Sequence, residues 1–387
     1  MLYDVLTRQE MPFNAAADLV YSNLRVAVEG DDTHGYRAAL RANGNTYNYY
    51  VVRENGAYKL LAVSPLIAPL GRMALERLEA GDTESARRWL DWARMEQRPA
   101  NSEDPLVGWT FSRFWTAGGQ ADLADMRTGV ALLLADTAPT QKSLDLLLAA
   151  QTAARSDNEK LAIDLALART FSHLERWPQL EEVGARLAKA WPMSGHAFHY
   201  QQWARIQQKR WNEVSVASQE RLAKYPNDVS ALRTQVESAD IRGSFSDMAA
   251  HMRPLIDGVR ATPSEYNEFA WMSLLQQPVS GQAVEAARQA FEDTQGRDPA
   301  IAHTLACVYA ATGRPREARD LLLKNAVRPG SDELDDAMWF GFGMVAEAYG
   351  DAESAREYYS HVEKPKMALI PSTSVYAMAQ QRMKRLW

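Results

Sequence analysis

The sequence predicts an all-α solenoid of about seven helical hairpins, preceded by a small antiparallel β-meander. The main observation is a period: small or aliphatic residues recur at intervals of 34, 34, 35, 35 and 37, at Leu180, Val214, Met248, Ala283, Ala318 and Ala355. Such periods are typical of stacked helical hairpins, each of which buries one face against its neighbour. A second observation is that Tyr- and Val-rich segments separated by Asn-Gly dipeptides are confined to the first 65 residues, which indicates strands there.

Composition limits the class of protein. The chain has 387 residues, 46% of them hydrophobic and 11 of them Trp, so it has enough apolar side chains to fold. Its net charge of -6, with 43 Lys and Arg scattered among 49 acids, argues against a nucleic-acid partner. A single cysteine, Cys307, excludes an intrachain disulfide framework, and there is no CxxC pair for zinc.

The sequence also bears on location. Residues 1–10 carry Asp4, Arg8 and Glu10 and no apolar run, and nowhere does the chain approach the ~20 apolar residues that span a bilayer. We therefore expect no membrane insertion and a cytoplasmic protein. The alternative is a periplasmic one from which an upstream signal segment was removed.

Residues 1–65 are expected to form a small α+β capping module. Apolar spacing predicts a helix over Pro12–Val28, and alternation predicts three strands over Tyr36–Arg41, Thr46–Arg53 and Ala57–Val63. Asn43-Gly44 and Asn55-Gly56 fall between the strands, and these dipeptides favour two-residue hairpin turns.

Residues 66–96 are predicted to form the first helical hairpin, with Gly81 at the turn, and residues 97–124 an aromatic insertion. The insertion contains Trp109, Phe111, Phe114 and Trp115. Four large rings need cover, so this segment is either a packed plug against the array or a loop that binds a partner.

Residues 125–365 are predicted to form the main array of about six hairpins, and residues 366–387 a C-terminal capping helix. The predicted helices of the array are 128–134, 141–153, 161–174, 179–190, 200–208, 213–224, 231–241, 246–259, 267–276, 282–292, 301–311, 315–324, 337–348 and 352–362.

The last hairpin carries the most explicit motif: Trp339, Gly343, Ala346, Tyr349-Gly350-Asp351, Ala355 and Tyr359. This pattern resembles the tetratricopeptide repeat (TPR), of a bacterial type, and the resemblance extends over about residues 69–362. It implies a right-handed superhelix in which small residues allow close helix packing. Leu180, Val214 and Met248 stand where the family has alanine, and Gly184 where it has an aromatic, so we expect these middle hairpins to be tilted or more widely spaced.

TPR arrays usually bind peptides on a concave face lined by the first helix of each hairpin. The resemblance places the following residues there: Arg169, His173, His196, His199, Trp203, Arg233, Glu237, Asp240, Glu265, Glu268, Met272, His303, Cys307, Phe340 and Met344. The acidic middle of this set suits a partner with a basic segment. A clamp for a C-terminal carboxylate needs Lys and Asn, and the set contains no Asn.

Two pairs of residues have spacings that are compatible with metal binding or catalysis. His196 and His199 lie three apart and His303 and Cys307 four apart, which is a spacing typical of metal ligands and also of a thiol beside a base. The pairs belong to hairpins three repeats apart, and neither an orienting acid nor an oxyanion hole is evident. We therefore predict no metal, no cofactor and no catalytic residue.

The sequence thus predicts a non-enzymatic scaffold that binds a protein or peptide through the concave face. Two alternatives stay open: the scaffold region of a larger bacterial enzyme or envelope protein, and a ligand sensor gated by the aromatic insertion. The identity of the partner and the oligomeric state are not predicted.

Overall fold

The structure, a computed structural model, describes residues 25–42, 45–97, 106, 110–116, 121–258, 261–326 and 334–386. The chain folds into two compact units, Met1–Gln201 and Gln202–Trp387. The domain limits predicted at residues 65, 96, 124 and 365 do not coincide with this division and stay a proposal. In the described ranges, every helix is too short or too polar to cross a membrane.

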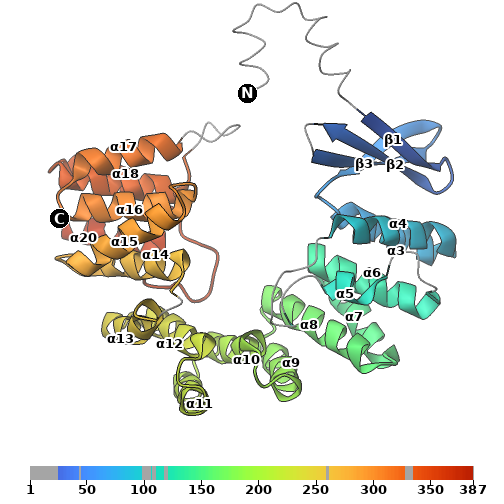
Figure 1. Cartoon of the computed structure of the whole chain (residues 1–387), viewed down its shortest axis with the longest axis horizontal. Helices are drawn as coiled ribbons and strands as arrows, with labels where there is room; N and C mark the ends of the chain where they lie inside the picture. Colours follow the sequence, from blue (N-terminus) through green and yellow to red (C-terminus); the bar gives the residue numbers. More distant parts are fainter. Residues whose placement is uncertain are drawn as a thin grey trace, which may run out of the picture. The chain divides into compact units, whose positions relative to one another are not determined.

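The first unit begins with a four-stranded antiparallel sheet whose strands pair in sequence order (Figure 1): β1 (Arg25–Asp31), β2 (Gly35–Ala42), β3 (Asn45–Glu54) and β4 (Ala57–Val63). The three predicted strands are confirmed. Asn55 and Gly56 have φ angles of 51° and 80°, as a two-residue hairpin turn requires, whereas Asn43 and Gly44 lie outside the described residues.

One sequence prediction is wrong in this region. The expected helix over Pro12–Val28 does not reach its C-terminal end, because residues 25–28 belong to β1; residues 12–24 lie outside the described residues. Val26 pairs with Leu40 and Val28 with Ala38 on β2. The four-residue apolar spacing that indicated a helix is also compatible with strand alternation, and strand pairing decides between them.

The sheet packs on helix α4 (Thr83–Glu96) through one face. Tyr50 and Val52 are buried on this face, and the ring of Tyr50 lies 5.9 Å from that of Trp92, centroid to centroid. Trp92 and the fully buried Trp89 form an edge-on pair at 4.9 Å. This aromatic cluster supplies the cover that a small sheet lacks by itself.

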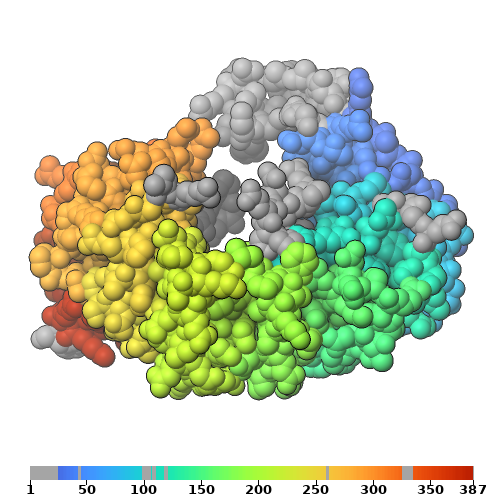
Figure 2. Space-filling model, turned by 60° about the horizontal axis from the view of Figure 1, so that its bottom comes forward, coloured from blue at the N-terminus to red at the C-terminus, as the bar shows by residue number. Residues whose placement is uncertain are grey.

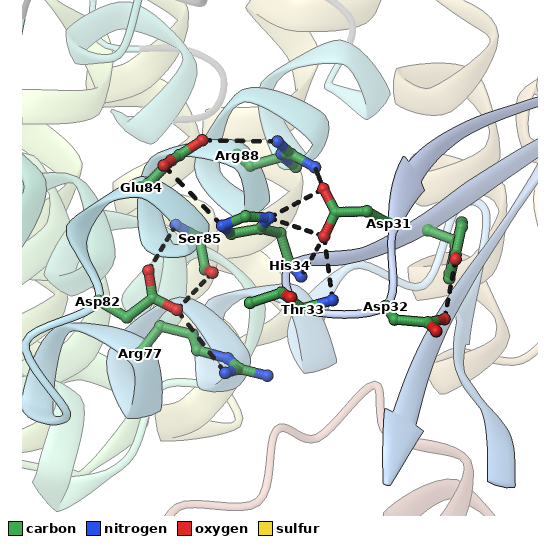
Figure 3. Close-up of polar contacts among 10 residues, drawn as sticks. Asp31, Asp32, Thr33, His34, Arg77, Asp82, Glu84, Ser85 and Arg88 are labelled. Atoms are coloured by element: carbon green, nitrogen blue, oxygen red, sulfur yellow. Dashed lines mark hydrogen bonds and ion pairs between the residues drawn. The ribbon is translucent and has the colours of Figure 1, made fainter. Parts of the chain in front are cut away.

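A polar network ties the β1–β2 turn to the start of α4 (Figure 3). Asp31 contacts Nδ1 of His34 at 2.7 Å and accepts a hydrogen bond from Arg88 of α4 at 2.9 Å. His34 also lies 3.9 Å from the carboxylate of Glu84. The sheet is therefore joined to the first hairpin by charges at one end and by aromatic rings along its face.

The described helices of the first unit form three hairpins, with a short helix between the first two. The hairpins are α3 (Ala68–Glu79) with α4, α6 (Leu123–Thr137) with α7 (Gln141–Ala153), and α8 (Asp157–His173) with α9 (Trp177–Ala190). Helix α5 (Thr110–Phe114) comes from the aromatic insertion and packs against α6 and α8.

Of the three rings of the insertion that the structure describes, two are buried and Phe114 is half-buried. Phe111 and Trp115 are buried and stacked, with centroids 6.3 Å apart, and the indole N–H of Trp115 donates to Asp91 at 2.8 Å. These two rings are therefore packed against the fold, and whether the insertion acts as a plug of the array stays a prediction. Trp109 lies outside the described residues.

Helix α10 (Gly195–Gln207) spans the limit between the units, and further helices follow in the second unit. Its helices are α11 (Trp211–Lys224), α12 (Val229–Arg242), α13 (Phe245–Ile256), α14 (Pro263–Met272) with the 3-10 turn η1 (Ser273–Leu275), α15 (Gly281–Asp293), α16 (Pro299–Ala311), α17 (Pro315–Ala326), α18 (Asp336–Ala348), α19 (Ala352–Ser360) and α20 (Val375–Arg385). Within each unit, successive segments pack in sequence order (Figure 2). In the described residues, seven pairs of consecutive helices pack on each other as hairpins: α3/α4, α6/α7, α8/α9, α12/α13, α14/α15, α16/α17 and α18/α19.

The period read from the sequence marks the core of these hairpins. All six residues that define it, from Leu180 to Ala355, are buried, and five of them are the fourth residue of a second helix. In α7 that fourth position is Leu144, which is buried, whereas Leu146, which lies 34 residues before Leu180, is only partly buried. The repeat is therefore two residues out of phase there.

Small residues let helices approach closely, as the motif predicts. A Cβ atom added at Gly343 would lie 2.4 Å from the ring of Tyr359, the partner aromatic on α19. A close approach also occurs between a middle hairpin and the helix that follows it: a Cβ at Gly184 of α9 would lie 2.7 Å from the backbone nitrogen of Gln201 on α10. The middle hairpins were expected to be tilted or more widely spaced. At this contact they are not widely spaced, because the missing side chain allows the close approach, and the expected tilt stays a prediction.

Helix α20 packs on α18 and α19 at the end of the array. Its Arg382 is buried and forms an ion pair with Glu347 of α18 at 3.1 Å, and the same carboxylate accepts the hydroxyl of Tyr359 at 2.8 Å. The C-terminal capping helix is thus held by a buried, hydrogen-bonded charge pair as well as by apolar contacts.

Candidate functional site

The first helices α12 and α14 of the second unit bring together most of the predicted acidic residues. Arg233, Glu237 and Asp240 follow one another at helical spacing along one face of α12. Glu265 and Glu268 lie on α14, and Arg233 forms an ion pair with Glu265 at 3.1 Å. We name Arg233, Glu237, Asp240, Glu265 and Glu268 the acidic face.

Glu265 has a structural role and is not a free surface acid. It is buried, and its carboxylate accepts the backbone N–H of Thr262 at 2.7 Å and the Thr262 hydroxyl at 2.9 Å. Thr262 and Glu265 form a capping box at the start of α14. The sequence Thr-Pro-Ser-Glu contains this signature, so the role of Glu265 was available from the sequence and was missed.

Glu237 and Glu268 are the chemically unusual members of the acidic face. Burial raises the pKa of Glu237 to about 7, and the negative charge of the nearby Glu268 carboxylate contributes a smaller part of this shift. Burial also raises the pKa of Glu268 above its ordinary value, although Arg233 opposes the shift. Two partly buried carboxylates that share one region favour either a proton or an incoming cation between them.

Asp240 is occupied by the chain's own C-terminal region. It accepts hydrogen bonds from the Ser372 hydroxyl at 2.7 Å, the Thr373 backbone N–H at 2.9 Å and the Thr373 hydroxyl. The indole N–H of Trp271 on α14 donates to the Thr373 carbonyl at 2.8 Å. We name residues 371–374 the docked turn; Ser374 closes it by donating its N–H to the carbonyl of Pro371 at 3.1 Å.

A cavity of about 280 Å³ lies beside the docked turn, between α14, α16 and α18. Asn267, Trp271 and His303 line it, and Val375 of α20 borders it. The side-chain oxygen of Asn267 is buried, and none of the described residues donates to it. Contrary to the sequence analysis, an asparagine is therefore present at this face, although no lysine is among the described lining residues.

Several residues predicted for the concave face are core residues instead. Met272, Phe340, Met344 and Cys307 are fully or almost fully buried, and His303 is nearly so. Phe340 packs edge-on against Trp271 at 5.6 Å. These side chains fill the space between α14, α16 and α18, so a partner cannot reach most of them. Helical periodicity alone does not tell a groove-facing position from one that faces the next hairpin.

The structure brings His303 and Cys307 together but does not make them reactive. The Cys307 sulfur lies 3.6 Å from Nε2 of His303, and that nitrogen lies 2.7 Å from the carbonyl of Ala337. Burial raises the pKa of Cys307 to about 12 and lowers that of His303. A protonated, enclosed thiol is a poor nucleophile and a poor metal ligand.

The remaining predicted residues lie along α8 and α10. Arg169 forms an ion pair with Asp136 at 3.0 Å, His173 and His196 are exposed, and Trp203 is half-buried. Burial, with a smaller contribution from His196, lowers the pKa of His199. Among the residues that the structure describes, no three His, Cys, Asp or Glu side chains converge as a metal site would require.

Sequence reasoning missed Trp271, Asn267 and the docked turn. Trp271 and Asn267 lie on the same helix as Glu268, but the family pattern gives them no role. The docked turn has a local signal, since Pro371 and three hydroxyl residues precede α20, but nothing in the sequence pairs it with Asp240.

No protein-family model matches the chain, and no curated protein matches it. Among solved structures it is similar to a tetratricopeptide repeat protein from Parabacteroides merdae, with 13% identity and a TM-score of 0.36 over 83% of this chain and 98% of that chain. It is also similar to the human IFIT1 dimer with m7Gppp-AAAA (13%, TM-score 0.44, 82% and 72%) and to the APC/C hetero-tetramer Cut9–Hcn1 (12%, TM-score 0.37, 76% and 57%). By the hairpins, turns and buried period described above, the chain is a TPR-like helical array.

Proposed function

We propose that the chain is a non-enzymatic scaffold that binds a protein segment on the acidic face, with a lysine or arginine of the partner against Glu237 and Glu268. The observation that carries this proposal is the docked turn. Asp240 and Trp271 already hold a polypeptide segment there by its backbone N–H, its backbone carbonyl and its hydroxyl groups. Repeat arrays commonly recognise peptides by such contacts from successive first helices.

The electrostatics favour a basic partner. Glu237 and Glu268 are partly buried, and neutralising their repulsion by a proton or a cation is favourable. A Lys or Arg side chain between them replaces the proton and adds charge-assisted hydrogen bonds, which are about twice as strong as neutral ones. The docked turn itself brings only hydroxyl and backbone groups, and no positive charge, to Asp240.

The test uses the full chain and a phage-displayed library of random 12-residue peptides. We expect enrichment of peptides with Lys or Arg, and at least about a tenfold weaker affinity when the Glu237→Gln, Glu268→Gln double variant is titrated with an enriched peptide in fluorescence polarisation. Glu285→Gln, on the exposed side of α15, is the matched control and should bind like the wild type.

Two results contradict the proposal. One is enrichment without any preference for basic residues. The other is an affinity that is the same for the wild type and the double variant, which would place the binding surface elsewhere. Replacing the basic residue of the peptide by glutamine separates charge recognition from backbone recognition, because only the former should be lost.

A further inference from the structure

A polar cavity in the first unit lies between the sheet, the first hairpin and α6. Its volume is about 750 Å³, within the range of small-ligand sites. Asn48 of β3, Ser64 after β4, Glu96 and Gln97 at the end of α4, and Asp136 at the end of α6 line it. The cavity is independent of the acidic face, and the proposed function assigns it no role.

Gln97 has a side chain that the fold leaves without a partner. It is 4% exposed, and neither its amide oxygen nor its amide nitrogen has a hydrogen-bond partner among the described residues. Buried amides in native proteins are nearly always paired, and leaving both ends unpaired is unfavourable. An amide that lines a cavity in this state is arranged to donate one hydrogen bond and accept another.

Two carboxylates beside Gln97 are held in place by the protein. Glu96 accepts Asn48 Nδ2 at 2.5 Å and the Ser64 hydroxyl at 2.6 Å, and also the hydroxyl of Tyr50. These three donors come from the sheet and the segment after it, so they fix the carboxylate at the cavity wall. A carboxylate offers about four acceptor positions, which leaves one for a ligand.

Asp136 is the second carboxylate, and its side chain is buried. It accepts the Thr110 hydroxyl at 2.6 Å and the Phe111 N–H at 2.8 Å from α5, and it pairs with Arg169 at 3.0 Å. Burial raises its pKa. No lysine or arginine is among the described lining residues, so the cavity is rich in acceptors and suits a ligand that donates several N–H groups.

We propose that this cavity binds an α-amino amide group, an ammonium next to a carboxamide, as found in amino-acid amides and at peptide N-termini. The ammonium donates toward Glu96. The carboxamide pairs with Gln97, accepting from its Nε2 and donating to its Oε1. Leu66 and Met95, both exposed apolar residues at the cavity, offer contact for an aliphatic side chain of the ligand.

The test is isothermal titration calorimetry of the full chain with L-leucinamide, N-acetyl-L-leucinamide and L-leucine. Leucinamide should bind with a Kd at or below about 1 mM. Acetylation removes the ammonium and a free carboxylate removes the amide, so each should weaken binding by about tenfold or more. Equal binding of leucinamide and its acetylated form would overturn the proposal, and so would the absence of binding by all three.

Substitution of Gln97 separates recognition from folding. Gln97→Met keeps the volume and removes the unpaired amide, so the variant should keep or raise its melting temperature while losing about tenfold in affinity for leucinamide. Gln289→Leu, on the exposed surface of α15, is the control and should bind normally. Unchanged affinity in Gln97→Met overturns the proposal whatever its stability.

A second titration distinguishes the two possible sources of the α-amino amide group, a peptide N-terminus and a free amino-acid amide. Leucyl-glycyl-glycine that binds more tightly than leucinamide supports a peptide N-terminus as the occupant. Leucinamide that binds more tightly than the tripeptide supports a free amino-acid amide. Both outcomes support the proposed chemistry, whereas failure of both ligands contradicts it without bearing on the acidic face.

Discussion

Asp240 on α12 accepts a hydrogen bond from the backbone N–H of Thr373 at 2.9 Å, although the two residues are 133 positions apart. This contact, with that of Trp271, places the docked turn over the first helices of the second unit. The same unit therefore shows how a polypeptide segment can be held at this face, and the segment belongs to the chain itself.

Removing the Asp240 carboxylate should release the docked turn. Asp240→Ala removes three hydrogen bonds from the docked turn. We expect this loss to lower the free energy of releasing the turn by about 1–3 kcal/mol, because other contacts of the segment compensate in part. Hydrogen exchange followed by mass spectrometry should show faster exchange of the peptide that contains Ser372 and Thr373. Asp320→Ala, an exposed acid on α17, is the control. Unchanged exchange would show that the turn is held by other contacts.

Glu237 predicts a pH dependence of stability. Its pKa in the folded chain is about 7, against an ordinary value of 4.5, so the folded state binds the proton more tightly. The stabilisation from this proton is complete below pH 4.5 and is lost as the pH rises through 7. Glu237→Gln should therefore raise the free energy of unfolding at pH 8 by up to about 3 kcal/mol and have little effect at pH 4.5.

Urea denaturation of the wild type and of Glu237→Gln at both pH values checks this prediction. Glu285→Gln, whose carboxylate is exposed, should show no comparable dependence. An equal effect of Glu237→Gln at both pH values would mean that the glutamate is solvated and not buried as described.

A side chain added at Gly343 should destabilise the fold by overpacking. Gly343→Ala would place a Cβ atom 2.4 Å from the Tyr359 ring, which is fully buried and hydrogen-bonded to Glu347, so the ring cannot move freely. We expect destabilisation by about 1–3 kcal/mol in thermal or chemical denaturation. Gly281→Ala, where no atom lies within 4 Å of the added Cβ, should be neutral or slightly stabilising. The idea is contradicted if both variants melt alike.

Replacing Lys209 by glycine should stabilise the folded chain. It has a φ angle of 59° at the turn between α10 and α11, and Arg210 donates its N–H to the carbonyl of Arg205, as in a Schellman motif. A side chain is strained in this left-handed conformation, so Lys209→Gly should stabilise the chain by about 0.5–1 kcal/mol. Lys160→Gly, inside α8, should instead destabilise it by about 1 kcal/mol. A loss in Lys209→Gly would refute the turn assignment.

The hairpins were predictable because their signals are local. Turn glycines such as Gly81 and Gly350 take positive φ angles, and the buried period reports one core position per second helix. Where the turn residue is Glu175 or Lys209, no glycine marks it, and the helix boundaries come from the apolar pattern alone. The helix expected over residues 25–28 failed because a four-residue apolar spacing fits two structures and cross-strand pairing chooses between them.

The candidate site was predicted only in part. The acidic character of α12 and α14 follows from residues at helical spacing, and Glu237, Asp240 and Glu268 do lie together. That Glu265 caps a helix, that Phe340 and Met344 are core, and that Asp240 holds Thr373 depend on how neighbouring helices rotate against one another. The sequence by itself determined the repeat, its period and its hairpins, because these rest on short-range periodicity and turn chemistry. Tertiary structure alone decided which side chains are open to a partner, because burial and long-range hydrogen bonds depend on contacts between residues far apart in the chain.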